Sequence, residues 1–268
     1  MSSDKLRLGG MALRNGLLVH GPTHWAAAVR TPGGEVKVAS GRKPELGSRR
    51  TERLPGVRGV TKLAEAFAVI PLVKRALPEA RLPMQDSRTL GAMGGATLVG
   101  RALRSSGGRR TLAREAALAG LSLVPAMLAL RGGDLASYHG VEHKSIAAYE
   151  QDSPDAAGAS KEHDRCGSNL VAPMLASTAA GNVAVRRAGI SGPAAEAIVG
   201  LGSVAFAVEV FAWSERHSES AFARLLRRPG HEIQRLVGTR EPTAEQLAVG
   251  QAALDEILRV EAAAAGQA

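Results

Sequence analysis

The residues best suited to chemistry are two histidines and a glutamate, His139, Glu142 and His143. An α-helix turns by about 100° per residue, so these side chains share one face with Ile146 and Glu150. Imidazoles on adjacent turns can approach one tetrahedral ion at ~2.0–2.1 Å. The order H-x-x-E-H is that of a class of zinc hydrolases in which the carboxylate is the base and another ligand comes from elsewhere. The spacing predicts a divalent-metal site, with zinc favoured, His139 and His143 as ligands, and Glu142 as general base or ligand.

A second polar cluster, Glu162 to Asn169, offers the missing ligands. His163 and Cys166 have the i, i+3 spacing that lets both reach one ion on a helical turn, and thiolate and imidazole both suit zinc. A lone cysteine is more often a small buried hydrophobe, and a nucleophilic role needs a lowered pKa. Glu150 lies ~10.5 Å along the helix axis from His143. We therefore expect Glu150 to support the site or cap the helix.

The alternative to a metal site is a buried network in which the same side chains bond to one another or to the backbone. Such a network orders helices or docks a partner without doing chemistry. Buried polar groups need partners, so it is equally intolerant of substitution. The sequence leaves both interpretations open.

Composition predicts a mainly α protein. The 268 residues are 45% hydrophobic but only 3% aromatic, with abundant Gly and Ala, which favours helices packed through small side chains. The single cysteine, Cys166, excludes an internal disulfide and fits a reducing compartment. The polar, basic start has no apolar segment of the secretory type, so we expect a cytoplasmic start.

The net charge of +9 is concentrated in three segments, 37–58, 101–114 and 216–240. None of them is interleaved with the aromatic residues that single-strand nucleic-acid binders use for stacking. Nucleic-acid binding is therefore the weaker interpretation. A solvated or lipid-facing surface explains the charge more simply.

The expected order of elements is a small N-terminal β element followed by a helical bundle. Residues 25–30 and 35–38, joined by the turn TPGGE, form a candidate hairpin, and an exposed loop around Arg49 and Arg50 follows. Helical periodicity runs from Gly59 onward. Thr243 and Gln246 have capping-box spacing before an amphipathic helix. We predict three segments: the β element and loop at 1–58, a helical core at 59–242 and the C-terminal helix at 243–268.

Two apolar stretches raise the question of a membrane. Residues 116–130 carry no charge, and residues 197–213 are apolar except for Ser203 and Glu209, yet each is shorter than the ~20 residues that span a bilayer. Alone, each fits a buried or re-entrant helix. The five arginines at 101–114 precede the first stretch as a cytoplasmic flank would.

The sequence also resembles a known family. Its central segments YHGVEHKSIAAYE and EHDRCGSN resemble the paired signature of the YqhQ-like family, a bacterial domain of unknown function (1385) labelled as a predicted metal-dependent enzyme. Further resemblances, in the family's order, lie at Gly9–Gly10–Met11–Ala12 to Arg30, Leu54 to Val60, and Pro229 to Pro242. The family often has a Glu where this chain has Asn15, a Gln at Met11 and a Pro at Asp164.

The resemblance implies a membrane protein with several hydrophobic helices, but no established reaction. Together with the spacing of the histidines and Glu142, it leads us to expect a membrane-associated, metal-binding protein of the bacterial inner membrane. We expect the site to face the cytoplasm and to have a hydrolase activity of unknown substrate. Through the matched motifs, Tyr138, Arg165 and Asn15 are expected to support the site. If the family's Glu is a metal ligand, the site of this chain has one anionic ligand fewer, because Asn15 stands at that position. His20 or His24 is a candidate for the missing ligand, although such residues more often cap turns. No pattern indicates a substrate or an oligomeric state.

Overall fold

The computed structural model describes residues 5–48, 53–105 and 111–266, and it is mainly helical with one small sheet, as predicted. The predicted loop residues Arg49 and Arg50 and the arginines at 109 and 110 lie outside this part of the chain. The strands are β1 (Gly9–Leu13), β2 (Gly16–His20), β3 (His24–Arg30) and β4 (Val36–Arg42). The α-helices are α1 (Val57–Ala68), α2 (Ile70–Ala76), α3 (Ser87–Ser105), α4 (Leu112–Leu121), α5 (Val124–Arg131), α6 (Leu135–Glu150), α7 (Val171–Arg187), α8 (Pro193–Arg216), α9 (Ala221–Ile233) and α10 (Ala244–Ala265). Two 3-10 helices, η2 (Pro83–Gln85) and η3 (Gly167–Leu170), and a π-helix, η4 (Gln234–Gly238), complete the fold.

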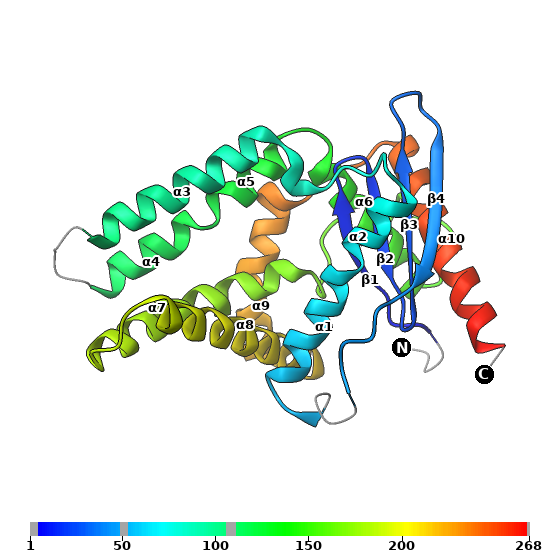
Figure 1. The fold of residues 1–268 in the computed structure, drawn as a ribbon. Coiled ribbons are helices and arrows are strands. Elements are labelled where there is room, and N and C mark those ends of the chain that lie inside the picture. Colours follow the sequence, from blue (N-terminus) through cyan, green and yellow to red (C-terminus); the bar gives the residue numbers. More distant parts are fainter. Residues whose placement is uncertain (1–4, 49–52, 106–110, 267–268) are drawn as a thin grey trace.

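The sheet is an antiparallel meander in the order β1-β2-β3-β4 (Figure 1). The predicted hairpin is confirmed, because β3 pairs with β4 in a register that sets Arg30 opposite Val36. In its turn, Gly34 has a φ of 88°, which glycine adopts without steric cost. The strands β1 and β2 were not predicted. These strands are short, apolar and contain glycine, and they lack the clear alternation of polar and apolar residues that marks a half-exposed strand.

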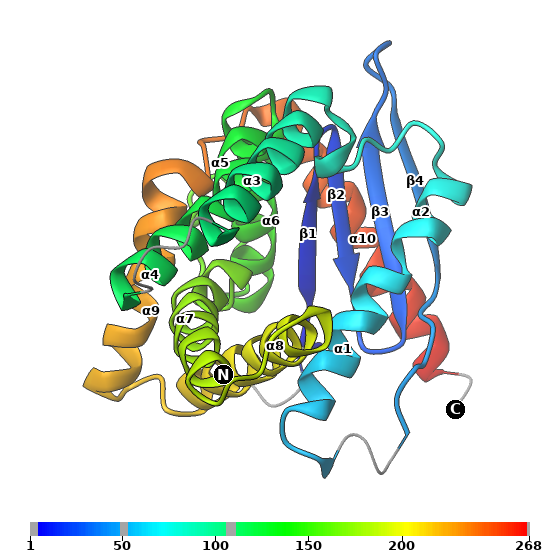
Figure 2. The ribbon, with the colours of Figure 1, turned by 60° about the vertical axis from the view of Figure 1, so that its left-hand side comes forward.

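Both faces of the sheet are covered, which explains the missing alternation. Alternate residues of β2 and β3 pack on α6 and α10 through one core, which includes Leu17, Val19 and Val249. The other residues pack on α2 and the residues directly before and after it through a second core around Leu18, Trp25 and Val73 (Figure 2). The first and third predicted segments thus share a core with α6. The division into three segments remains a prediction.

The C-terminal helix α10 begins with the predicted capping box. The backbone N–H of Gln246 donates to Thr243 Oγ1 at 3.3 Å, and the backbone N–H of Thr243 donates to Gln246 Oε1 at 3.0 Å. Leu254 is buried, and Leu247 and Leu258 pack against the same core, so the predicted inward face is confirmed.

Two groups of helices extend from this core as arms. One arm consists of α3 lying along α4 and α5, and the other of α7 lying along α8 (Figure 1). Near their far ends the arms meet, where Arg186 Nη1 of α7 lies 2.6 Å from Glu115 Oε1 of α4. The Glu115 side chain is 1% exposed, and such a buried pair holds one arm against the other.

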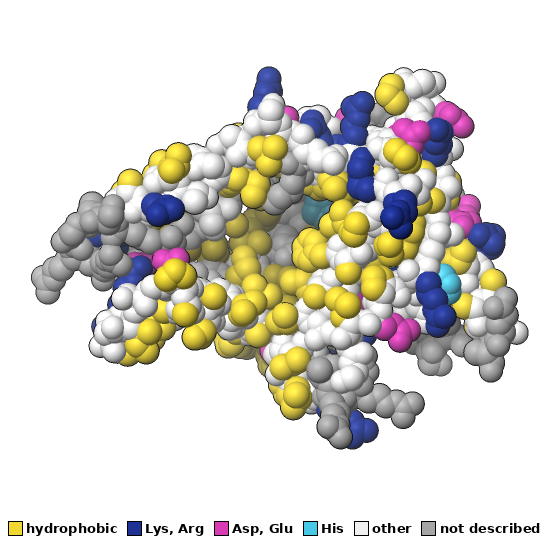
Figure 3. Space-filling view, viewed as in Figure 1, with side chains coloured by type: hydrophobic (Ala, Val, Ile, Leu, Met, Phe, Trp, Pro, Cys, Tyr) yellow, Lys and Arg dark blue, Asp and Glu magenta, His cyan; other side chains and the backbone are white. Residues whose placement is uncertain are grey.

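The arms expose large apolar surfaces. Leu98 on α3 and Ile198 on α8 are each 69% exposed, and Figure 3 shows hydrophobic side chains along both arms and in the hollow between them. The segments Ala113–Arg131 and Pro193–Arg216 are long and apolar enough to cross a membrane, and only 22% of each is buried. The interpretation of these stretches as buried helices is therefore wrong. The first segment is also interrupted by a turn at 122–123, after which α5 begins at Val124 with Pro125 in its first turn.

Candidate metal centre

The helix α6 carries the predicted site and lies in the middle of the molecule. Close packing on two sides fixes its position. A Cβ on Gly140 would lie 2.3 Å from the carbonyl oxygen of Arg240, and a Cβ on Gly250 of α10 would lie 2.3 Å from Val141 Cγ1. The backbone N–H of Arg240 also donates to the carbonyl of Ala136 at 2.9 Å. These contacts hold α6, and with it both histidines, in one position.

His139 is oriented through its Nδ1 atom. That atom lies 2.8 Å from the carbonyl oxygen of Gly238, at the end of η4. A carbonyl can only accept, so Nδ1 carries the hydrogen. The other nitrogen, Nε2, lies 3.3 Å from Cys166 Sγ. His139 therefore directs the nitrogen available for a metal toward the thiol.

His143 is oriented in the same way, one turn further along α6. Its Nδ1 atom lies 2.6 Å from the carbonyl oxygen of Lys161 and donates to it. Its Nε2 atom is buried and has no hydrogen-bond partner among the described residues. The two rings are 4.4 Å apart between centroids. A buried nitrogen without a partner is costly, and a metal ion would satisfy it.

Cys166 completes a three-atom cluster. It is the N-cap of η3, where its Sγ accepts the backbone N–H of Ser168 at 3.4 Å. Ligand atoms of His139, His143 and Cys166 all lie within 4.8 Å of one another. Ligands around tetrahedral zinc are roughly 3.3–3.6 Å apart, so the widest pair needs to close by about 1 Å. The donor set and spacing fit a zinc ion with one further position for water or substrate.

The charges in the cluster suit a cation. Burial lowers the pKa of His139, but the hydrogen bond and charge of Cys166, together with Glu142, raise it to about 9. Burial and the neighbouring charge of His139 lower the pKa of His143 to about 3. A proton on His139 therefore occupies the place that a metal ion would take. His143 stays neutral, which is the form that binds metal.

Glu142 lies beside the cluster and against the sheet. A Cβ on Gly10 of β1 would lie 2.5 Å from Glu142 Cγ, so the strand leaves just enough room for this side chain. Burial raises the pKa of Glu142, while the charges of His139 and His163 partly oppose the rise. The side chain remains partly accessible, and its carboxylate accepts no hydrogen bond from the residues that the structure describes. It is free to handle a proton.

A comparison with models of protein families matches residues 133–260 to a family described as protein of unknown function (DUF1385). The chain is therefore similar to this family over residues 133–260. The matched segment begins just before α6 and ends within α10, so it contains every member of the cluster. Searches of curated proteins and of solved structures found no match to the chain.

Within the DUF1385 segment, His163 stands next to the cluster but outside it. Its ring is 5.7 Å from that of His143. Its Nδ1 atom accepts the backbone N–H of Arg165 at 3.2 Å, and its Nε2 atom faces Glu150 Oε2 at 3.3 Å. Both ring nitrogens are therefore engaged, and burial lowers the pKa of His163. Cys166 rather than His163 therefore supplies the third atom of the group that could hold a metal ion.

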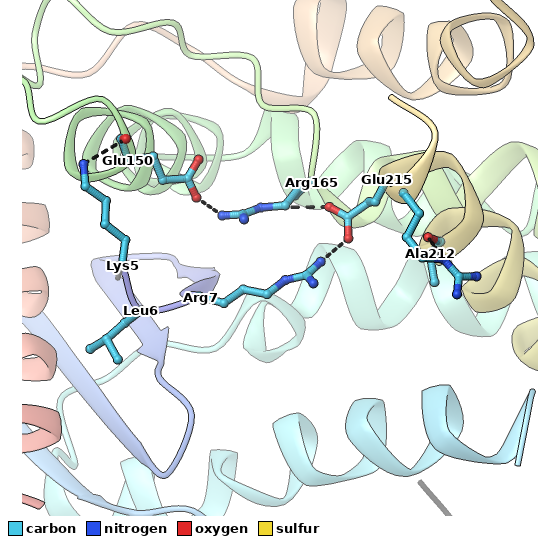
Figure 4. Close-up of a pocket in the computed structure, with 8 residues that line it drawn as sticks. Lys5, Leu6, Arg7, Glu150, Arg165, Ala212 and Glu215 are labelled. Carbon is cyan, nitrogen blue, oxygen red and sulfur yellow. Dashed lines mark hydrogen bonds and ion pairs between the residues drawn. The ribbon is translucent and has the colours of Figure 1, made fainter. Parts of the chain in front are cut away.

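Glu150 and Arg165 form the next layer outward. Arg165 pairs with Glu150 and lies 4.0 Å from Glu215 of α8, and Glu215 pairs in turn with Arg7 (Figure 4). This network lines a pocket of about 330 Å³. Glu150 thus reaches the cluster only through His163, in keeping with the expectation that it supports the site.

The structure places Tyr138 and Asn15 away from the cluster. Tyr138 is buried in the core shared by the sheet, α6 and α10. The Asn15 side chain donates to the carbonyls of Arg30 and Glu79 and so fixes the turn between β1 and β2. The candidate extra ligands His20 and His24 are also elsewhere: His20 is buried in β2, and His24 contacts Thr23.

Three residues that position the site were not identified from the sequence. Gln234, fully buried in η4, accepts the backbone N–H of His163 at 2.8 Å and donates to Ser168 Oγ at 2.8 Å. Lys144 donates to the carbonyls of Ala157 and Ala159 and fixes the loop that leads to Lys161 and Cys166. Gly238 contributes only a carbonyl. Gln234 and Gly238 lie within the C-terminal segment that resembles the family. The resemblance of a whole segment does not show which of its residues support the site.

Proposed function

We propose that this protein is a membrane-associated, metal-dependent hydrolase in which His139, His143 and Cys166 hold a zinc ion and Glu142 is the general base. One observation carries the proposal. Both histidines have their Nδ1 atoms bound by backbone carbonyls, and Nε2 of His143 has no partner among the described residues. His139 Nε2 faces Cys166 Sγ at 3.3 Å, and one ligand atom from each of the three residues lies in a single cluster. Outer hydrogen bonds of this kind set the tautomer and ring orientation of zinc-binding histidines.

The zinc ion would supply Lewis-acid chemistry at the inner end of the hollow between the arms. Three protein ligands with a fourth position for water or substrate are typical of catalytic zinc, whereas structural sites have four protein ligands. Glu142, next to His143 along α6, would take a proton from the attacking water and return it to the leaving group. The raised pKa of Glu142 is in keeping with both roles.

The alternative is a buried polar network without chemistry. In a network of that kind each buried polar atom has a partner, and a half-satisfied one destabilises the fold. Within the part of the chain that the structure describes, Nε2 of His143 and the carboxylate of Glu142 have no hydrogen-bond partner, which fits a binding site better than a completed network.

The membrane part of the proposal is supported by the two apolar, mostly exposed segments in the arms. We propose the bacterial inner membrane, with the site on the cytoplasmic side, because a thiolate ligand without a disulfide partner suits a reducing compartment. Arg101 and Arg114 lie near the α3–α4 connection, at the end of the arm away from the sheet (Figure 1). They therefore do not flank the end that carries the site, and they give no support to this orientation.

Metal analysis of the purified protein tests the metal site. The wild type should contain one zinc per chain, and the double variant His139→Ala, His143→Ala should contain negligible metal. Glu142→Gln serves as the control, because a general base is not a ligand, and it should keep zinc and leave the melting temperature unchanged or raised. Equal and negligible metal in the wild type and the double variant would end the proposal. A lowered melting temperature for Glu142→Gln would instead favour the structural network.

Cell fractionation tests the membrane association. The protein should sediment with membranes, stay there through a high-salt wash that removes electrostatically bound proteins, and enter solution only with detergent. Recovery in the soluble fraction without detergent would contradict this part of the proposal.

A further inference from the structure

An apolar pocket of about 250 Å³ lies directly beside the metal centre, and His139 forms part of its wall. The pocket is lined by residues of both arms and of α9 and η4, which precede α10. The lining includes Met127 and Leu130 from α5, Val171 from α7, and Ile233 and Val237 from α9 and η4. The pocket therefore begins at the proposed ion and extends between helices that border the hollow.

The chemistry of the pocket excludes most polar ligands. Its two polar side chains other than His139 are Ser168 and Gln234, and these are bonded to each other at 2.8 Å. Among the described residues, no Asp, Glu, Lys or Arg side chain lines it. Sites that enclose a drug-sized molecule usually measure about 300–1,000 Å³, so this space suits a narrow hydrocarbon chain better than a sugar or a base.

The position of the pocket indicates where such a chain comes from. Leu123, Ala126, Met127 and Leu130 of the wall belong to Ala113–Arg131, one of the two segments apolar and long enough to cross a membrane. Hydrophobic side chains continue from the arms into the hollow (Figure 3). Lipid chains beside the arms would thus reach the metal centre without crossing a polar surface.

We propose that the substrate is an acylated membrane amphiphile whose hydrocarbon chain occupies this pocket and whose scissile carbonyl lies at the metal centre. This inference rests on the proposed function. In the reaction, water adds to the carbonyl carbon, Glu142 accepts its proton, the bond to the leaving oxygen or nitrogen breaks, and that atom takes the proton. The products are a carboxylic acid and an alcohol or amine.

Binding of alkyl hydroxamates tests the pocket without a known substrate. Acetohydroxamate, hexanohydroxamate and decanohydroxamate share one metal-binding head and differ only in chain length. On zinc-loaded protein in nanodiscs, affinity should rise about fourfold per buried methylene until the pocket is full. Ala126→Trp should fill the pocket, weaken decanohydroxamate at least about tenfold, and leave acetohydroxamate unchanged.

The matched control is Ala117→Trp. Ala117 is also an exposed alanine of the same arm, on α4, and it does not line the pocket. Long hydroxamates partition into the bilayer, but at a given chain length this effect cancels between the two variants. Equal affinities for decanohydroxamate in Ala126→Trp and Ala117→Trp would overturn the inference. The zinc content of the same samples shows which hypothesis has failed. If the protein contains zinc but affinity does not depend on chain length, only the inference about the pocket is wrong. If the protein contains no zinc, the proposed function is wrong.

Discussion

Replacing Cys166 with Ser should weaken zinc binding by more than about 100-fold. Loss of an outer partner of a ligand typically costs 10–100-fold in metal affinity, and loss of a ligand costs more. Serine has nearly the same size and can still accept the backbone N–H of Ser168, so η3 should keep its cap. Its hydroxyl is not deprotonated near neutral pH and binds zinc poorly compared with a thiolate. Competition with a chromophoric chelator measures the change.

His163→Ala is the informative comparison for Cys166→Ser, because the sequence nominates both positions as ligands. Both ring nitrogens of His163 are engaged by Arg165 and Glu150, so this variant should reduce affinity by less than about tenfold. If His163→Ala removed zinc as completely as Cys166→Ser, the assignment of the third ligand would be wrong, and a rotated His163 ring would take its place.

The second large effect is expected from Gly140→Ala, although alanine is the better helix former. The added Cβ would lie 2.3 Å from the carbonyl oxygen of Arg240, and backbone cannot rotate away as a side chain can. Overpacking of this kind costs about 1–3 kcal/mol or more, against a gain of about 0.5–1 kcal/mol from helix propensity. We expect a net loss of about 2 kcal/mol and a melting temperature lower by roughly 4–8 °C. Zinc affinity should fall as well, because His139 is the preceding residue.

Gly94→Ala provides the matched control. Gly94 lies within α3, and a Cβ there would meet nothing within 4 Å. The same substitution should therefore stabilise the protein by about 0.5–1 kcal/mol, since only helix propensity changes. Thermal unfolding of both variants in one detergent gives the comparison. Equal melting temperatures for Gly140→Ala and Gly94→Ala would show that α6 can move away from Arg240.

Local signals in the sequence predicted several elements correctly. Periodicity and capping located α10, the turn TPGGE located the β3–β4 hairpin, and the paired motifs located α6. The helical spacing alone also placed His139 and His143 on one face. Each of these features depends on residues close together in the chain, so no long-range contact was needed to recognise it.

The rest depended on contacts between distant segments. The strands β1 and β2 are apolar on both faces because helices from two other parts of the chain cover them, and this hides their alternation. The sequence treated His163 and Cys166 as equal candidates, since the i, i+3 spacing does not show which way a ring points. Tertiary structure separated them, by bringing Glu150 to His163 and leaving Cys166 facing His139.

By itself, the sequence determined that two imidazoles and a carboxylate lie on one helical face and that a cysteine follows nearby. Only the tertiary structure decided which nitrogens are free, because the carbonyls of Gly238 and Lys161 that occupy the Nδ1 atoms come from remote segments of irregular or π-helical backbone. Every residue has a backbone carbonyl, so the order of side chains in the sequence does not show which carbonyls bind the histidines. The folded chain is what turns a common helical spacing into a directed set of ligand atoms.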